Sequence, residues 1–124
     1  MKLALRFGAC ISLLLLAACA SSSKNSFPDS VDKTIEKNQS EFDKCYDFAV
    51  KHKSDSEPAP IGRIQMGFTV SPAGKVTESN VISSEVNNPR LEKCVQETLR
   101  RLSFPSNEEG RLIQTTYPFD FGKK

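Results

Sequence analysis

A short apolar run near the amino terminus sets the limits within which this chain can fold. Residues 9–18 are apolar with one exception, and Lys2 and Arg6 precede them. A transmembrane helix needs about 20 apolar residues, so the run is too short to span a bilayer. A positive start followed by a short apolar core is instead typical of a signal peptide. We therefore expect residues 1–18 to be removed, which leaves residues 19–124 to fold.

The end of the run predicts a covalent modification. It reads Leu16-Ala17-Ala18-Cys19, with small residues directly before a cysteine, and this resembles the bacterial lipobox. In that family the cysteine thiol is coupled to diacylglycerol, the chain is cut before it, and the new amino terminus is acylated. The resemblance implies that Cys19 is the lipidated first residue of the mature protein. The alternatives are an uncleaved membrane helix, which the polar residues 21–24 argue against, and a secreted soluble protein.

A lipidated Cys19 also implies a location. Each buried methylene contributes about 0.8 kcal/mol, and two or three acyl chains anchor a protein stably. Ala20 is not the aspartate that commonly keeps enteric lipoproteins at the inner membrane. The resemblance therefore implies the outer membrane, with the domain in the periplasm, and leaves open which face of that membrane carries it.

The mature chain has the size of a single domain. Residues Ala20–Pro28 are small and polar, which predicts a tether over 19–29 with about 15 to 20 Å of reach, followed by one domain over 30–124. Without Lys2 and Arg6 the chain keeps 15 basic and 15 acidic side chains. The charges of residues 33–51 alternate in sign, which favours a solvated helix face. Since no basic stripe is visible, we expect no nucleic-acid partner.

Two segments place apolar residues at helical spacing and the others alternate at every second position. The first helix is predicted from Asp29 to about His52, and the second begins with the cap-and-proline pair Asn88-Pro89 and ends before Pro105. Alternation predicts strands at 63–70, at 76–83 after the turn Ser71–Lys75, and at Ile113–Phe121. Pro118 places one side of the last strand at a sheet edge, because proline is rarely tolerated inside a sheet.

The order helix, strand, strand, helix, strand comes with three stretches that resemble a known family. They are FTVSPAGKV at Phe68–Val76, CVQETLRRLSFP at Cys94–Pro105 and YPFDF at Tyr117–Phe121. With the pair Cys45-Tyr46, they resemble the AgmX/PglI C-terminal domain over residues 35–121. That family is similar in turn to the TonB and TolA C-terminal domains. The resemblance implies an α+β fold in which a small three-stranded antiparallel sheet carries two helices on one face.

The same resemblance has limits for function. TonB proteins have an inner-membrane helix and a long proline-rich spacer, whereas this chain has a lipobox-like cysteine and a short tether, so energy transduction is not implied. The name AgmX refers to gliding motility, but a shared fold does not carry a shared process.

The remaining cysteines predict a disulfide. Cys10 leaves with the signal peptide and Cys19 carries lipid, so Cys45 and Cys94 are left in an oxidising compartment. Each lies on the apolar stripe of its helix, and packing the helices side by side could bring the two Cα atoms to about 5.5 to 6 Å. Two buried free thiols are the alternative. No CxxC spacing occurs and His52 is the single histidine, so we expect no metal and no cofactor.

No nucleophile, base and metal constellation is visible, so we expect no catalytic residue and no enzyme. Glu108-Glu109 is better explained as a solvated hairpin tip than as a carboxylate pair. The leading hypothesis is an interaction module that binds another envelope protein, whose identity the sequence leaves unknown, by strand addition. The strand edge would be Ile113, Gln114, Thr115, Thr116 and Tyr117. Self-association through this edge, a structural lipoprotein of an envelope or motility complex, a peptidoglycan-contacting module and an undetected hydrolase stay as alternatives.

Overall fold

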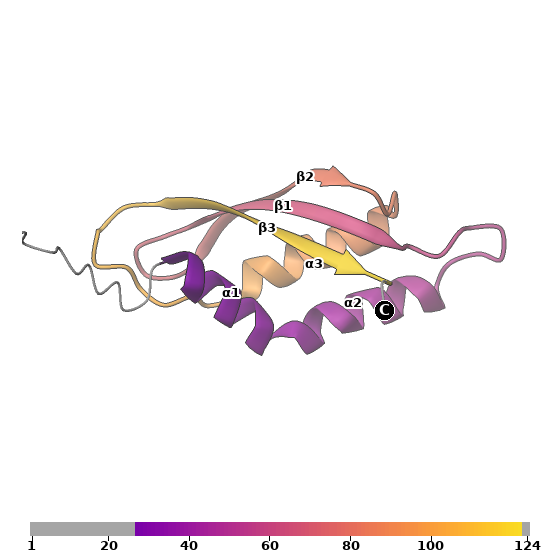
Figure 1. The fold of residues 1–124 in the computed structure, drawn as a ribbon, viewed down its shortest axis with the longest axis horizontal. Coiled ribbons are helices and arrows are strands. Elements are labelled where there is room, and N and C mark those ends of the chain that lie inside the picture. Colours follow the sequence, from indigo (N-terminus) through magenta and orange to yellow (C-terminus); the bar gives the residue numbers. More distant parts are fainter. Residues whose placement is uncertain (1–26, 123–124) are drawn as a thin grey trace, which may run out of the picture.

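The computed structural model describes residues 27–122, which form three helices and three strands. In chain order these are α1 (Phe27–Lys37), α2 (Gln39–Lys51), β1 (Gly62–Val70), β2 (Val76–Ser84), α3 (Pro89–Arg101) and β3 (Ile113–Phe121). The strands form one antiparallel sheet in the order β2-β1-β3. The helices lie along one face of the sheet and leave the other face open (Figure 1). The predicted α+β fold, with a three-stranded antiparallel sheet and helices on one face, is confirmed.

The alternation in β1 builds the core. Ile64, Met66 and Val70 are fully buried against the helices, while Arg63 is exposed on the open face. Burying a large aliphatic or aromatic side chain contributes roughly 1.5 to 3 kcal/mol, so this row holds the sheet to the helices. The helices and β3 complete the core with Val31, Ile35, Phe42, Ala49, Leu91, Val95, Leu99, Phe119 and Phe121.

The region predicted as one helix from Asp29 to His52 is two helices, separated at Asn38. In a continuous helix the Asn38 N–H would donate to the Thr34 carbonyl, but here it donates to the Ile35 carbonyl at 3.0 Å. The Asn38 side-chain amide takes over and donates to the Thr34 carbonyl at 2.7 Å. Asparagine favours such breaks because its short amide competes with the helical hydrogen bonds of the backbone. The two helices therefore meet at a bend without leaving that carbonyl unpaired.

Helix α1 begins at Phe27, two residues before the predicted start, and so takes in the end of the expected tether over 19–29. Phe27 packs against the core, and a proline is well accommodated in a first helical turn because its missing N–H has no partner to lose. The expected signal peptide, Cys19 and the tether up to residue 26 lie outside the described residues. Within residues 27–122, no helix combines the length and apolar character needed to cross a membrane.

A disulfide joins α2 to α3, as predicted. Cys45 and Cys94 are bonded with a Cα–Cα distance of 5.6 Å, and the Cys45 sulfur lies 3.4 Å from the hydroxyl of buried Thr98. The start of α3 also agrees with the sequence, because the Asn88 side chain accepts a hydrogen bond from the Leu91 N–H at 2.9 Å. The disulfide fixes α3 beside α2, and α3 in turn packs on β2.

Candidate functional site: the free edge of β3

Strand β3 lies at an edge of the sheet, where the sequence placed it. It pairs with β1 without interruption from Ile113 opposite Val70 to Phe121 opposite Gly62. Its other side faces no strand among residues 27–122. Phe119 and Phe121 are buried, whereas Ile113, Thr115 and Tyr117 are only partly covered by the helices. The first half of β3 is therefore the more accessible half of the edge.

The backbone direction at this edge can be worked out from β1. The Glu85 N–H donates to the Arg63 carbonyl at 2.8 Å, so the backbone groups of Arg63 face the β2 side. Backbone groups of residues two apart point to the same side of a strand, so Gln65 also faces β2. Pro118 lies opposite Gln65, and its nitrogen therefore faces away from β1, where a proline costs no ladder hydrogen bond.

The same alternation assigns the donors of the free edge. The backbone N–H and carbonyl groups of Gln114 and Thr116 face outward with the Pro118 nitrogen, whereas those of Thr115 point to β1. No side chain or loop within the described range donates to, or accepts from, the backbone of Ile113–Tyr117 outside the sheet. An incoming strand finds donors and acceptors at Gln114 and Thr116 but loses a donor at Pro118. The segment Ile113–Tyr117 is thus the part of the edge open to pairing.

Beyond Pro118, an ion pair between Arg63 and Asp120 joins β1 to β3 on the open face of the sheet. The Arg63 guanidinium donates two hydrogen bonds to the Asp120 carboxylate, at 2.9 and 3.0 Å. This bidentate pair joins β1 to the end of β3 and is largely exposed, so its contribution to stability is small. It lies between the two strands and does not cover the outer edge of β3.

Helix α1 places two acidic residues beside the open end. Burial raises the pKa of the Tyr117 hydroxyl above its ordinary value, and the carboxylates of Asp32 and Glu36 raise it further. The two acids lie one helical turn apart, so they share a face of α1. The shift keeps the Tyr117 hydroxyl neutral to a higher pH than an ordinary tyrosine, so that it can donate a hydrogen bond at the edge.

The opposite edge, along β2, is built differently. The pairing of β2 with β1 shifts register between Gln65 and Met66 and again between Thr69 and Val70. The Gln96 side chain on α3 donates to the Ser79 carbonyl at 2.5 Å, and the Arg100 guanidinium donates to the Ser79 hydroxyl at 3.1 Å. Bulges and side-chain cover are the usual protection of edge strands. An outward backbone carbonyl of β2 is thus bonded by a side chain, whereas among residues 27–122 the outward backbone groups of Gln114 and Thr116 on β3 are not.

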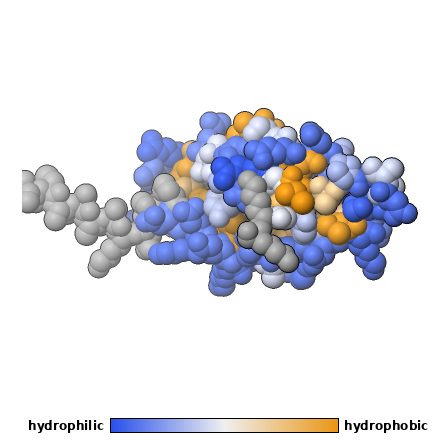
Figure 2. Space-filling model, turned by 45° about the vertical axis from the view of Figure 1, so that its right-hand side comes forward, coloured by the Kyte–Doolittle hydropathy of each residue, from blue (hydrophilic) through white to orange (hydrophobic). Residues whose placement is uncertain are grey.

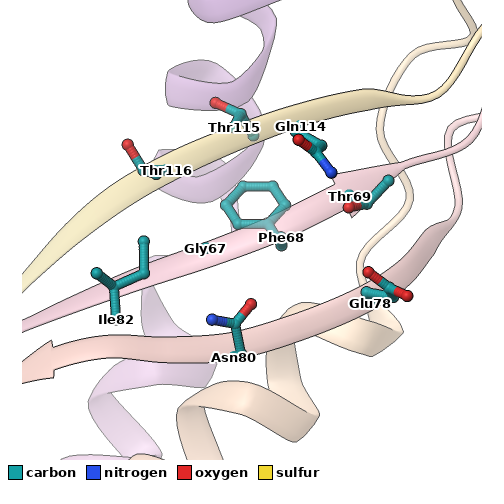
Figure 3. Close-up of a pocket in the computed structure, with 9 residues that line it drawn as sticks. All are labelled: Gly67, Phe68, Thr69, Glu78, Asn80, Ile82, Gln114, Thr115 and Thr116. Carbon is teal, nitrogen blue, oxygen red and sulfur yellow. The ribbon is translucent and has the colours of Figure 1, made fainter.

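A shallow hollow of about 310 Å³ lies on the open face, centred on Gly67. Figure 3 shows Gln114 and Thr116 of β3 along one side and Glu78, Asn80 and Ile82 of β2 along the other. A Cβ atom added at Gly67 would lie 2.9 Å from the Cδ1 atom of Ile82, so this exposed side chain would have to shift. Hydroxyl, amide and carboxylate groups line the hollow, so it is suited to a polar side chain or a hydroxylated ligand.

The remaining surface offers small apolar areas. Figure 2 shows them as separate patches on a mainly hydrophilic face. The exposed large apolar side chains among residues 27–122 are Phe48, Val50, Ile61, Ile82 and Leu112. Leu112 directly precedes β3, so it stands beside the open edge.

The structure does not bring the other chemically active residues together. Glu109 pairs with Arg111 at 2.7 Å, and the His52 ring lies 4.1 Å from that of Phe48. In the described part of the chain, no three histidine, cysteine, aspartate or glutamate side chains lie close enough to hold a metal ion. Sequence reasoning missed the Gly67 hollow, for which an isolated glycine in a strand was the one available signal.

Comparison with protein-family models, curated proteins and solved structures finds no match to this chain. The resemblance to the AgmX/PglI and TonB C-terminal domains therefore stays a prediction from the quoted residues.

Proposed function

We propose that this protein is a non-catalytic interaction module, anchored by lipid on Cys19 in the bacterial envelope, that binds an extended segment of another envelope protein at Ile113–Tyr117. The observation that carries the proposal is the free edge of β3. Its backbone groups are unoccupied in a continuous, bulge-free strand, which is the arrangement that strand addition requires. The resemblance to the TonB domain supports the same mode of binding.

The proposed location is supported from two directions. The lipobox-like residues before Cys19 support the anchor, and the Cys45–Cys94 disulfide supports an oxidising compartment, because disulfides are rare in reducing cytosol. The periplasmic side of a membrane agrees with both, and Ala20, in place of the aspartate that keeps enteric lipoproteins at the inner membrane, favours the outer membrane.

The alternation of backbone donors gives a sharp test. Thr116→Pro removes an outward N–H group and should abolish capture of the partner while the domain stays folded. Thr116→Val removes only the hydroxyl and should leave capture unchanged. Each variant would be expressed in cells with a photo-crosslinking residue at Gln114, and crosslinked proteins would be compared by mass spectrometry. Identical partners at identical yield for Thr116→Pro and wild type would exclude pairing at this edge.

A second candidate function, contact with peptidoglycan as a structural lipoprotein, is favoured by the Gly67 hollow. Its hydroxyl and amide side chains match the hydroxyls and amides of glycan and peptide. Co-sedimentation with isolated peptidoglycan measures this directly. Asn80→Ala with Gln114→Ala should release the protein from the pellet, whereas Glu97→Ala, on α3 and outside the hollow, should not.

A further inference from the structure

Helix α1 separates its charges onto two sides. Asp32 and Glu36 lie near Tyr117 of β3, as their effect on its hydroxyl indicates. Lys33 and Lys37 line a groove on another side of the helix, which has a volume of about 710 Å³. The opposite wall of this groove is the end of α3 and the segment after it, with Arg101 and Ser103. The zero net charge of the mature chain therefore conceals a local cationic surface.

The groove carries positive charge. None of its lining residues is acidic. Within residues 27–122, the ion pairs join other residues, so Lys33 and Lys37 face no carboxylate at bonding distance. Arg101 donates to the Thr98 hydroxyl at 3.4 Å. Its charge also helps to lower the pKa of Glu41, whose carboxylate is paired with Lys44 at 2.7 Å. Three cations thus share one concave surface.

The floor of the groove combines apolar and polar surface, and its large apolar side chains are nearly buried. Leu102 and Phe104 reach it but are only 7% and 5% exposed. The accessible polar groups are hydroxyls from Ser30, Thr34 and Ser103, which can donate hydrogen bonds to an anion. Three cations together with hydroxyl donors are suited to phosphate groups.

The place of the groove in the chain indicates which phosphates it meets. Helix α1, which forms one wall, begins at Phe27, eight residues after Cys19. Eight residues span at most about 29 Å when fully extended, and about 15 Å on average when flexible. A lipid on Cys19 therefore keeps this wall within a short distance of the membrane surface.

We infer that the groove formed by Lys33, Lys37 and Arg101 docks onto anionic phospholipid head groups of the membrane that holds the anchor. This inference rests on the proposed lipid anchor. Each basic residue near an anionic surface contributes about fivefold in affinity, since roughly 1 kcal/mol per charge converts at 1.4 kcal/mol per tenfold change. Because the acidic side of α1 and edge β3 lie elsewhere, docking leaves the partner edge free.

Lysine acylation of the intact lipoprotein tests the inference. Protein purified from membranes is reconstituted into vesicles of phosphatidylcholine alone or mixed with phosphatidylglycerol, and a water-soluble amine reagent is added. We expect Lys33 and Lys37 to react about fivefold more slowly only where phosphatidylglycerol is present, and high salt to remove the protection. Lys51 and Lys93, which lie outside the groove, should react at one rate throughout.

Charge variants provide the matched control. Arg101→Gln should reduce the protection of both groove lysines, Arg101→Lys should retain it, and Lys93→Gln should not change it. Equal labelling in the two kinds of vesicle, or equal protection of Lys51 and Lys93, would overturn the inference. Protection by inorganic phosphate in phosphatidylcholine vesicles, without any effect of phosphatidylglycerol, would overturn the membrane as the source of the anion.

Flotation separates this inference from the proposed anchor. Wild type that does not float with phosphatidylcholine vesicles refutes the anchor. In that case flotation with phosphatidylglycerol vesicles at low salt still supports docking of the groove onto anionic head groups. If the protein does not float with these vesicles either, the docking inference is overturned.

Discussion

The two edge strands of this sheet differ in how far their outward backbone groups are covered. Edge β2 has two register shifts and receives a hydrogen bond from Gln96 on α3 at its Ser79 carbonyl. Edge β3 is continuous from Ile113 to Phe121, and only Pro118 interrupts its outward donors. Proteins generally blunt exposed strand edges to avoid unwanted pairing. The contrast teaches that edge protection is local here, and that Ile113–Tyr117 is a stretch without it.

The largest effect is expected from removing the disulfide, because it holds the helix that covers edge β2. Replacing Cys45 and Cys94 with alanine should lower the free energy of unfolding by about 4 kcal/mol. The unfolded chain gains this much because the loop that the disulfide closes is no longer constrained. Hydrogen exchange should then rise in β2 more than in β3. Urea unfolding and exchange mass spectrometry measure both, with reduced wild type as the control. A loss below about 1 kcal/mol would show that packing alone holds α3 in place.

A pair of proline variants tests the backbone direction of edge β3. Thr115→Pro removes an N–H group that faces β1 and leaves a carbonyl of β1 without its donor, which should cost about 3 kcal/mol in unfolding free energy. Thr116→Pro removes an outward group and should cost less than about 1 kcal/mol. Thermal unfolding of the two variants distinguishes them. The reverse order would mean that the assignment of inward and outward groups is wrong.

Removing the cover of edge β2 should make the two edges more alike. Gln96→Ala leaves the Ser79 carbonyl without its side-chain donor and should lower stability by about 1 kcal/mol. Glu97→Ala, at an exposed neighbouring position, is the control. Sedimentation should show weak self-association of Gln96→Ala alone, because the exposed edge can pair with a second copy. A monomeric Gln96→Ala at high concentration would show that the two bulges protect β2 by themselves.

The smallest effect concerns pH at edge β3. Burial first, and then Asp32 and Glu36, raise the pKa of Tyr117, so the fold favours the neutral hydroxyl. The stability from this group is complete below the unfolded pKa of 10.0 and is lost as pH rises from there through the folded pKa. Asp32→Asn with Glu36→Gln should lower the folded pKa part of the way, and Asp47→Asn should not. Phenolate absorbance in a Tyr46→Phe background measures it, and an unchanged titration would place the acids too far from the edge.

The spacing of apolar residues was sufficient to place the helices and strands, but it did not show the break between α1 and α2. The row Ile64, Met66, Phe68, Val70 and the stripe of α3 are visible as spacing, because burial on one face repeats along the chain. The break at Asn38 is not, since the seven-residue step from Ile35 to Phe42 fits one helix or two. The decision depends on a single amide that replaces a backbone donor.

Sites that join distant segments were predicted least well. Pro118 alone placed β3 at an edge, because proline restricts one strand position directly. Lys33 and Lys37 were interpreted as part of a solvated helix face, and nothing in their spacing relates them to Arg101 across the groove. The Gly67 hollow likewise needs Asn80 and Gln114 from the two outer strands. Contacts between residues on distant segments depend on the order in which the strands pair. The spacing of residues along the chain does not reveal that order.

The position of Pro118 also limits how long a partner strand could stay paired with β3. A strand that pairs only along the five residues before it would extend about 17 Å, which is the length of a short strand. A contact of that size belongs to the small, weak class of interfaces, in which partners separate quickly. A partner bound as proposed would then dissociate quickly and rebind often, because Pro118 limits the length of the paired segment.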